Sequence, residues 1–333
     1  VEVIKMENLV LFDVAEGTQN LGDYIIMQCI MDEMDFYFKD KFLTHYSTHT
    51  PIARFYQNFR RNMMSRACDN SKNKFICGAN TIKESLLRIS PDWNINVFNI
   101  KYYRNCITIG VGMDMNSKHM DLYTKFIYKR IFSKNYIHSV RDDRTKKTFE
   151  KLGYKAINTG CPTTWKLTEE FCKSIPTKKS EEVVFTLTDY DKDSVNDQKL
   201  IDILKDNYKK IYFWVQGSED YDYFNTFNNI NNIEIISPNL KAYENILNDK
   251  SVDYVGTRLH AGIYALRHKV RSIIIAIDNR ARDMSKTYSL NTIDRNNIDE
   301  LSKMINSDFK TNIKINTKEI EKWKSQFKGD NYE

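Results

Sequence analysis

The stretch Gly256–His260, GTRLH, combines residue types that bind anions and exchange protons. It follows a short apolar run that predicts a strand, and it leads into the periodic stretch Leu259–Arg267, which predicts a helix. If Thr257 caps this helix, Arg258 and His260 fall in the first turn, where free N–H groups and the helix dipole favour an anion. A guanidinium suits carboxylate or phosphate, and imidazole exchanges protons near neutral pH. The sequence therefore predicts an anion-binding turn.

A structural interpretation of these residues stays open, in which Arg258 pairs with an acid and His260 only caps the helix. Position favours function, because ligands of doubly wound sheets bind at the carboxyl ends of strands. The next predicted strand ends at Asp278, and the loop 279–283 follows it. Neighbouring strands end side by side, so Arg280 could join the same phosphate site. A solvated charged loop is the alternative.

Three junctions in the first half also bring polar groups to predicted strand ends. In NLGD, which runs from Asn20 to Asp23, Gly22 allows the backbone to approach a ligand closely. An ordinary turn with Asp23 as a first-turn acid is the alternative. SVRDD places Arg141 where a second anion clamp could lie, and GCPTTW presents Trp165, whose indole could stack on a sugar ring.

Other candidates are weaker. His45 and His49 are four residues apart and could chelate a metal, but no third ligand lies nearby, so we expect no metal site. Asp189 and Asp191 could form a carboxylate pair, although a solvated loop is the preferred interpretation. The six cysteines are dispersed, without a CxxC pair, which argues against zinc and disulfides and indicates buried, reduced thiols.

Composition describes a globular protein of two-domain size. The chain has 333 residues, 41% hydrophobic and 28% charged, and no run approaches the roughly 18 apolar residues of a membrane span. The net charge of +6 suits a phosphorylated small substrate or an acidic membrane surface, and no nucleic-acid module is present. No secretion signal is recognised at the start, so we expect a cytoplasmic protein, with peripheral association at the inner face of the membrane also compatible.

Short β-branched or aromatic runs alternate with longer periodic segments along the chain, which indicates an α/β fold with parallel sheets. Strands are predicted at 9–14, 74–77, 106–111, 136–140, 156–159, 183–188, 211–216, 233–236, 253–256 and 271–277. Helices are predicted at 23–38, 121–132, 142–152, 196–208, 221–228, 240–247, 259–267 and 318–327. We expect two Rossmann-like domains facing a cleft, an acceptor-side domain at 1–174 and an anion-binding domain at 183–305. The remaining tail, 306–333, is expected to pack back on the first domain.

Several blocks together resemble the polysaccharide pyruvyl transferase family. They are NLGD, ITIGVGMD (Ile107–Asp114), SVRDDRTKKTFEKLG leading to NTGCP, VGTRLHAGIYAL and IIIAIDNRARDM. The blocks occur in the order typical of the family and extend from about Asn20 to Met284.

The resemblance implies a GT-B-like fold of two Rossmann-like domains and a transferase of polysaccharide biosynthesis. Such enzymes transfer the enolpyruvyl group of phosphoenolpyruvate to a sugar, form a cyclic ketal and release phosphate, without a further cofactor. The resemblance assigns Arg258, Leu259 and His260 to the phosphoenolpyruvate site and matches Arg141 to a family arginine. Arg280 stands where the family often has Lys, which keeps the charge but changes a point donor into a fork.

We therefore expect pyruvylation of a sugar in a cell-surface polysaccharide such as a capsule, or in its lipid-linked precursor. His260 is the expected general acid or base, with Arg258 and Arg141 stabilising charge. The phosphoenolpyruvate contacts are expected from Thr257 to His260, from Arg280 and from Arg141. Two alternatives stay open, a GT-B glycosyltransferase that uses a nucleotide sugar and a non-catalytic scaffold of capsule assembly.

Overall fold

Two compact units make up the chain in the computed structural model, which describes residues 6–87, 93, 95–113, 120–249 and 251–329, without the side chain of Arg280. The first unit contains 1–18, 26–165 and 316–333. The second contains 19–25 and 166–315. The chain therefore passes between the units four times, and we describe each unit by itself.

The first unit is a parallel α/β sheet. Its strands are β1 (Asn8–Asp13), β2 (Phe42–Ser47), β3 (Asn73–Cys77), β4 (Cys106–Ile109), β5 (His138–Val140) and β6 (Ala156–Asn158), and its helices are α1 (Leu21–Glu33, begun in the second unit), α2 (Asp35–Phe38), α3 (Met63–Asn70), α4 (Leu122–Ile131), α5 (Asp143–Lys151) and α13 (Thr317–Ser325), with 3-10 turns η1 (Phe55–Phe59), η2 (Ile100–Tyr103) and η3 (Pro162–Thr164). The sheet order is β2-β1-β3-β4, and the pair β5-β6 continues it through a parallel bridge between Val111 and Val140.

Alternating side chains cover both faces of this sheet. Val10, Phe12 and Ile76 pack with Ile127 of α4 and with Phe149 of α5 in one apolar cluster. The opposite face carries aromatic rings, because Phe75 of β3 lies against Tyr37 and Phe38 of α2 and against Phe327 after α13. The C-terminal segment is thus part of the core of the first unit.

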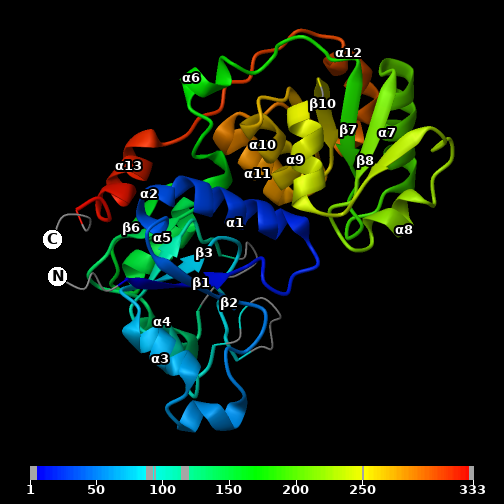
Figure 1. Cartoon of the computed structure of the whole chain (residues 1–333). Helices are drawn as coiled ribbons and strands as arrows, with labels where there is room; N and C mark the ends of the chain where they lie inside the picture. Colours follow the sequence, from blue (N-terminus) through cyan, green and yellow to red (C-terminus); the bar gives the residue numbers. More distant parts are fainter. Residues whose placement is uncertain (1–5, 88–92, 94, 114–119, 250, 330–333) are drawn as a thin grey trace. The chain divides into compact units, whose positions relative to one another are not determined.

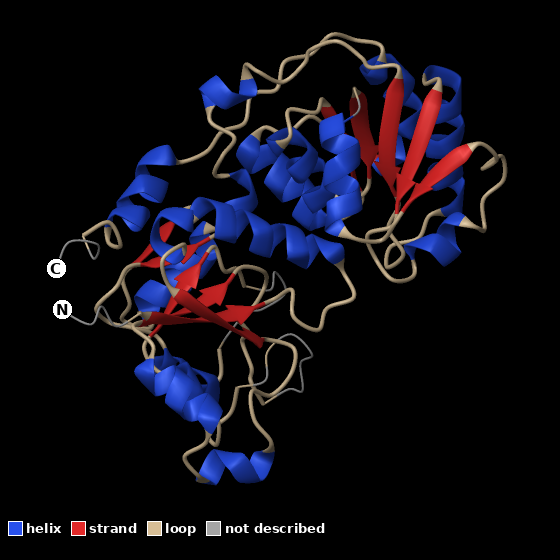
Figure 2. Ribbon diagram, viewed as in Figure 1, coloured by secondary structure: helices blue, strands red, loops and turns tan. Residues whose placement is uncertain are grey.

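The second unit has a six-stranded parallel sheet with helices on both faces (Figures 1 and 2). Its strands are β7 (Glu182–Thr186), β8 (Lys210–Trp214), β9 (Ile233–Ile236), β10 (Val252–Gly256), β11 (Ser272–Ala276) and β12 (Thr292–Asp294), and its helices are α6 (Glu169–Cys172), α7 (Ser194–Asn207), α8 (Asp220–Phe224), α9 (Leu240–Asp249), α10 (Leu259–Arg267), α11 (Asn279–Tyr288) and α12 (Leu301–Ile305), with the turn η4 (Arg295–Glu300).

The order of these strands is β12-β11-β10-β7-β8-β9. The chain builds outward from β7 to β9, then returns to the other side of β7 with β10. Loops after β7 and β10 consequently leave in opposite directions, and this switch point is where doubly wound sheets bind ligands. The α/β class and the Rossmann-like character of both units are confirmed.

Several expectations about local structure are corrected. The strands β2 and β12 were missed, and residues 279–283 are not a loop but the start of α11, because the side chain of Asp278 accepts a hydrogen bond from Ala281 N and caps a helix. His45 lies in β2, so His45 and His49 do not share a helix face.

The units also divide at other places than the predicted boundaries of 1–174, 183–305 and 306–333. The first unit continues only to Trp165, whose ring packs against Trp323 of α13 with centroids 5.8 Å apart. Residues 316–333 belong to this unit, whereas 306–315 stay with the second.

Two composition-based expectations have structural counterparts. All six cysteines are buried and none forms a disulfide, as expected. Among the helices formed by the described residues, none combines the length and the apolarity needed to cross a membrane.

His138 is a buried titratable group at the start of β5. Its Nε2 donates to Ser133 O at 2.8 Å, and its Nδ1 accepts from Thr108 N at 3.3 Å, which together require the neutral imidazole. Burial lowers the pKa of His138 from 6.5 to about 4, although the bond to Ser133 opposes this shift. The unfolded chain therefore takes up a proton between pH 6.5 and pH 4 that the folded chain does not.

The stability that His138 contributes should be present above pH 6.5 and be lost progressively towards pH 4. Between pH 7.5 and pH 5 this loss corresponds to about 2 kcal/mol of unfolding free energy. Urea unfolding of the wild type and of His138→Gln at both pH values measures this loss. Between pH 7.5 and pH 5 the variant should lose about 2 kcal/mol less unfolding free energy than the wild type. Equal pH dependence of the two proteins would contradict the assignment of a neutral His138.

Candidate active site

The turn after β10 lies at the switch point of the second unit, where Gly256 pairs in register with Thr186 of β7. Thr257 N donates to Thr186 O at 3.1 Å, and the Thr257 hydroxyl lies 2.8 Å from that of Thr188. Arg258 N donates to the Thr186 hydroxyl at 3.2 Å. Residue 256 must be glycine, because a Cβ there would lie 2.5 Å from Thr186 Oγ1 and 2.7 Å from the backbone nitrogen of the same residue. These contacts hold the turn against β7.

The N-terminus of α10 lies directly after this turn. The expectation that Thr257 caps the helix is corrected: the cap position is Arg258, and the Thr257 hydroxyl contacts Thr186 and Thr188 instead. The side chain of Arg258 makes no capping hydrogen bond to this end. The first turn carries the positive end of the helix dipole, and its backbone N–H groups have no intrahelical partner.

His260 is the second residue of α10 and is 8% exposed, and the whole helix is buried. Its neighbour Leu259 is also buried, at 4% exposure. The first turn thus offers a shielded, low-dielectric place in which an imidazole and helix N–H groups lie within a few residues of one another. Such a place strengthens electrostatic interactions with a bound anion.

Two carboxylates hold Arg258. This agrees with the alternative from the sequence in which Arg258 pairs with an acid. Its Nη2 contacts Asp189 at 2.9 Å and also pairs with Asp220, while Nε donates to Asp220 at 3.1 Å and to Leu187 O at 3.0 Å. The side chains of Arg258 and Asp220 are 4% and 0% exposed. Nη1 makes no hydrogen bond with the described residues, so one corner of the fork is available.

The pKa values of this cluster follow from burial and charge. Burial raises the pKa of Asp220, and Arg258 opposes that shift. Burial disfavours the charge on Arg258, but Asp220 and Asp189 outweigh it and raise the pKa of the guanidinium. Arg258 therefore stays protonated, and its first task is to fix the turn in place.

The NLGD segment joins this cluster from the far end of the sequence. Asn20 Oδ1 accepts from Gly22 N at 3.0 Å and from Gln216 Nε2 at 2.9 Å, and Asn20 bridges to Gly217. Gly217 lies directly under the guanidinium, since a Cβ there would lie 2.3 Å from Arg258 Nη2. The Oε1 atom of Gln216 is buried without a hydrogen-bond partner among the described residues, so a ligand hydroxyl could donate to it.

Of the remaining predicted residues of this region, Asp23 lies in the first turn of α1, in agreement with its alternative interpretation as a first-turn acid. Arg280 lies in the first turn of α11, and its side chain is outside the described residues. Asp114, the end of the ITIGVGMD block, also lies outside them.

Arg141 lies at the carboxyl edge of the sheet in the first unit. Its backbone N–H donates to Val111 O at 2.9 Å, and its guanidinium donates to the Asn80 side chain. A Cβ on Gly112 would lie 2.1 Å from Arg141 Nε, so the arginine lies directly across the glycine backbone. Asp142 is 3.8 Å away and partly balances the charge.

Trp165 is a core residue of the first unit. Its indole is 4% exposed, Nε1 donates to Thr159 O at 2.8 Å, and its ring packs on Trp323. A side chain fixed in this way presents no open face for a sugar. We therefore correct its assignment as an acceptor-binding residue and give it a packing role.

A possible metal site lies elsewhere on the first unit. Ligand atoms of Asp13, Glu16 and His45 lie within 4.8 Å of one another at the carboxyl ends of β1 and β2. His45 Nδ1 lies 2.7 Å from Asp13 Oδ2, and Asp13 Oδ1 accepts from Ala15 N at 2.7 Å. These three residues could hold a cation, but hydrogen bonds already satisfy Asp13. The expectation of no metal remains an expectation.

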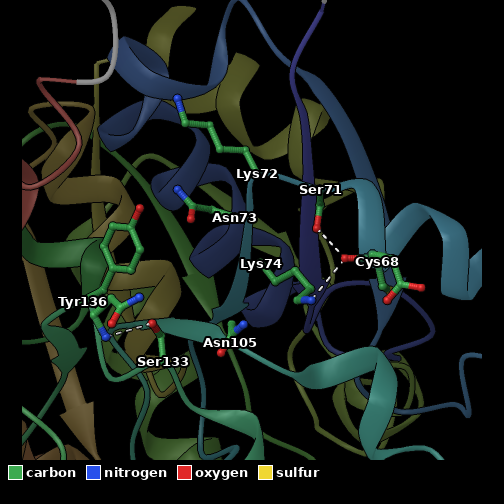
Figure 3. A pocket seen from close by; sticks show the side chains of 10 residues that line it. Cys68, Ser71, Lys72, Asn73, Lys74, Asn105, Ser133 and Tyr136 are labelled. Carbon is green, nitrogen blue, oxygen red and sulfur yellow. Dashed lines mark hydrogen bonds between the residues drawn. The ribbon is translucent and has the colours of Figure 1, made fainter.

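Figure 3 shows a pocket of about 330 Å³ at the opposite edge of the same sheet. Asn73 and Asn105, which line it, lie at or before the amino ends of β3 and β4. Lys74 Nζ and Ser71 Oγ both donate to Cys68 O, at 3.1 and 2.9 Å. The polar groups thus stabilise one another at the edge where α/β sheets do not bind substrates.

Sequence reasoning missed Asp220 and underrated Asp189, which it preferred to assign to a solvated loop. Both follow strand ends, Asp189 after β7 and Asp220 after β8. The rule that favoured GTRLH would also have found Asp189, because TDYD follows an apolar strand. Asp220 could not be recognised as a site residue from the sequence, because it is the first residue of a short helix, where acidic residues are common.

Asp220 should contribute more than Asp189 to the free energy of unfolding. Asp220→Asn removes the charge of a fully buried partner and should lower the unfolding free energy by about 3 kcal/mol, as expected when a buried pair is broken. Asp189→Asn, the matched variant, should cost about 1 kcal/mol, because its side chain is 15% exposed and Asp220 remains to balance Arg258. Urea unfolding at neutral pH measures both, and equal losses would show that Asp220 is not the main anchor.

The whole chain was compared with solved structures and with protein families. The chain is similar to a UDP-GlcNAc 2-epimerase of Methanocaldococcus jannaschii, solved with UDP-GlcNAc and UDP, at 12% identity and a TM-score of 0.50 over 96% of this chain and 98% of that one. It is also similar to the UDP-GlcNAc 2-epimerase of Neisseria meningitidis bound to UDP-GlcNAc, at 10% identity and a TM-score of 0.49 over 98% and 100% of the two chains. At this identity the likeness shows the fold alone, which is of the GT-B type.

No curated protein matches the chain in sequence. The sequence model of one family, described as polysaccharide pyruvyl transferase, matches residues 20–279. The match begins at Asn20, which accepts a hydrogen bond from Gln216, and ends at the first residue of α11, so it includes Arg258. The chain belongs to the polysaccharide pyruvyl transferase family.

Proposed function

We propose that the protein transfers the enolpyruvyl group of phosphoenolpyruvate to two hydroxyls of one sugar, forms a cyclic ketal and releases phosphate. The acceptor is a cell-surface polysaccharide, such as a capsule, or its lipid-linked precursor. The observation that carries the proposal is the uncapped first turn of α10 at the switch point, which holds His260 beside a fixed Arg258. Membership of the family supports the transfer of a pyruvyl group in general.

Phosphoenolpyruvate carries a phosphate and a carboxylate, and the second unit offers donors for such anions. The N–H groups of the first turn, Thr257 beside them and the open Nη1 of Arg258 can receive one group. Arg280, in the first turn of α11, is proposed to bind the other. In the first unit Arg141 is proposed to bind an anionic group of a substrate. No cofactor is proposed, because phosphoenolpyruvate is a co-substrate.

The proposed chemistry balances with one acid and base. His260 donates a proton to the methylene carbon C3, which becomes a methyl group, and the resulting cationic C2 is attacked by one sugar hydroxyl. That hydroxyl loses its proton to the imidazole. The second hydroxyl then displaces phosphate from C2, and its proton leaves with the phosphate. Arg258 and the helix dipole stabilise the negative charge that grows on the leaving oxygen.

Replacement of His260 by Ala should reduce phosphate release from phosphoenolpyruvate about 100-fold or more, the usual share of general acid–base catalysis. The matched control is His268→Ala on the last turn of the same helix, where the imidazole contacts Asn248. The control should stay within about twofold of the wild type. Equal rates for the two variants would remove His260 from the chemistry.

The two alternatives have distinct signatures in the same experiments. A glycosyltransferase predicts that a nucleotide sugar, and not phosphoenolpyruvate, raises the melting temperature. A scaffold predicts no phosphate release with any acceptor, in the wild type as in His260→Ala.

A peripheral membrane location is proposed from an exposed surface of the first unit. Phe55, Tyr56 and Phe59 of η1 are 63%, 61% and 65% exposed, and Phe98 packs against two of them at 5.3 and 5.9 Å. The segment 51–66 also carries four exposed arginines and no acid, and none of the four makes an ion pair with the described residues. Figure 1 shows η1 in blue on a projection beyond α3. Aromatic side chains among cations are typical of surfaces that bind anionic lipids.

Vesicles that contain anionic lipid should therefore bind the protein, and neutral vesicles should bind it weakly. Phe55→Ser with Phe59→Ser should weaken binding about tenfold or more, since two rings no longer enter the interface. Phe42→Ser on β2, a ring of similar exposure, is the control. Co-sedimentation measures all three, and an unchanged double variant would contradict the proposal.

A further inference from the structure

A groove of about 630 Å³ lies between α4 and α5 in the first unit. Five of its lining residues are cationic: Lys125 and Lys129 on α4, and Arg144, Lys147 and Lys151 on α5. Their spacings of three, four and seven residues place them on one face of each helix. Both helices therefore turn their basic faces toward the same space.

The lysine charges of this groove are not balanced by carboxylates of the described residues. No carboxylate of the described residues lies within 4.0 Å of the four lysine ammonium groups. Glu84 is the only acid in the lining, and its Oε1 is buried without a hydrogen-bond partner among those residues. Like charges one turn apart on a helix destabilise it, and Lys125 and Lys129 are such a pair. An arrangement that concentrates repulsion in a concave site is typical of an anion-binding surface.

The floor of the groove is apolar. Met113, Met120 and Leu152 line it, and the Thr148 hydroxyl donates to Met113 Sδ at 3.6 Å. Thioether and aliphatic groups suit the C–H faces of sugar rings, whereas the surrounding lysines suit substituents that project from the rings. The chemistry of the lining thus fits a charged carbohydrate better than a bare inorganic anion.

The groove begins near the carboxyl edge of the sheet. Met113 directly follows Gly112, the residue across which Arg141 lies, and Arg144 comes three residues after Arg141. From there the basic face continues along α5 to Lys151. Because the rise per helical residue is about 1.5 Å, Arg144 and Lys151 are about 10 Å apart along the axis. One phosphate cannot span that distance, and several charges along a chain can.

We propose that the groove between α4 and α5 binds a linear polyanionic carbohydrate, whose negative charges are phosphodiesters or sugar carboxylates. If the proposed function holds, this carbohydrate is the acceptor, and the groove holds it so that its reacting sugar lies towards Arg141. The inference about the acceptor rests on the proposed function, whereas binding of the polyanion does not.

The test measures binding of defined chains to the full-length protein by isothermal titration calorimetry. The probes are an oligogalacturonate, a polyphosphate of similar length and inorganic pyrophosphate. Both chains should bind more tightly than pyrophosphate, and the tighter of the two identifies carboxylate or phosphate as the preferred charge. If pyrophosphate binds as tightly as the chains, the groove is a diphosphate site and the proposal is wrong.

Lys129→Gln with Lys147→Gln removes one cation from each helix and should weaken chain binding about tenfold or more, with a shallower dependence on salt concentration. Lys146→Gln with Lys155→Gln is the matched control, because it removes the same charge from α5 and the following loop outside the groove lining. The control should stay within about twofold of the wild type. Equal weakening in both would show unspecific attraction to a basic surface and overturn the proposal.

Failure of the two proposals can be told apart. Loss of phosphate release in the presence of intact chain binding would reject the transferase reaction and leave the groove assignment standing. Phosphate release with a neutral acceptor, together with no chain binding, would support the reaction and reject the groove.

Discussion

The ion pairs of Arg258 with Asp220 and Asp189 determine how the second unit presents its switch point. Asp220 follows β8, Asp189 follows β7 and Arg258 follows β10, so one guanidinium joins three strand ends. Without Arg258, a buried carboxylate at this position would lower the stability of the fold, because burial disfavours its charge. Together they fix the N-terminus of α10, and Gly217 gives the guanidinium the space to lie there. A rigid turn is the condition for a preorganised anion site.

The second buried arginine of this unit shows what a purely structural pair looks like. Arg271 is 1% exposed and pairs with Asp253 at 2.7 Å, and its other donors reach backbone carbonyls. It lies at the amino edge of the sheet, away from ligands. Arg258 uses the same kind of pairing at the carboxyl edge but leaves Nη1 open. Both arginines are buried, so burial does not distinguish a binding residue from a structural one. The edge of the sheet at which each lies, and the hydrogen-bond donor that Arg258 leaves unused, do distinguish them.

Sequence reasoning predicted the sheets because buried parallel strands and amphipathic helices have strong periodic signals. It missed β2, whose half-exposed side chains lack a continuous apolar run, and β12, which has three residues. The anion-binding turn could be located because a strand, a glycine and a helix are adjacent in sequence. The partners of Arg258 could not, since Asp189 and Asp220 are 69 and 38 residues away and only the strand order brings them together.

The positive charges of the chain differ in how carboxylates compensate them. In the second unit Arg258, Arg271, Arg282 and Arg295 each pair with a carboxylate, so their charges serve the fold. In the first unit, the four lysines of the α4–α5 groove and the four arginines of 51–66 make no ion pair with the described residues. A net charge of +6 therefore understates the local field at these two surfaces, because cations are concentrated there. The proposed small donor anion would thus meet a helix dipole and a fixed turn, whereas the proposed polyanionic carbohydrate would meet a row of lysines.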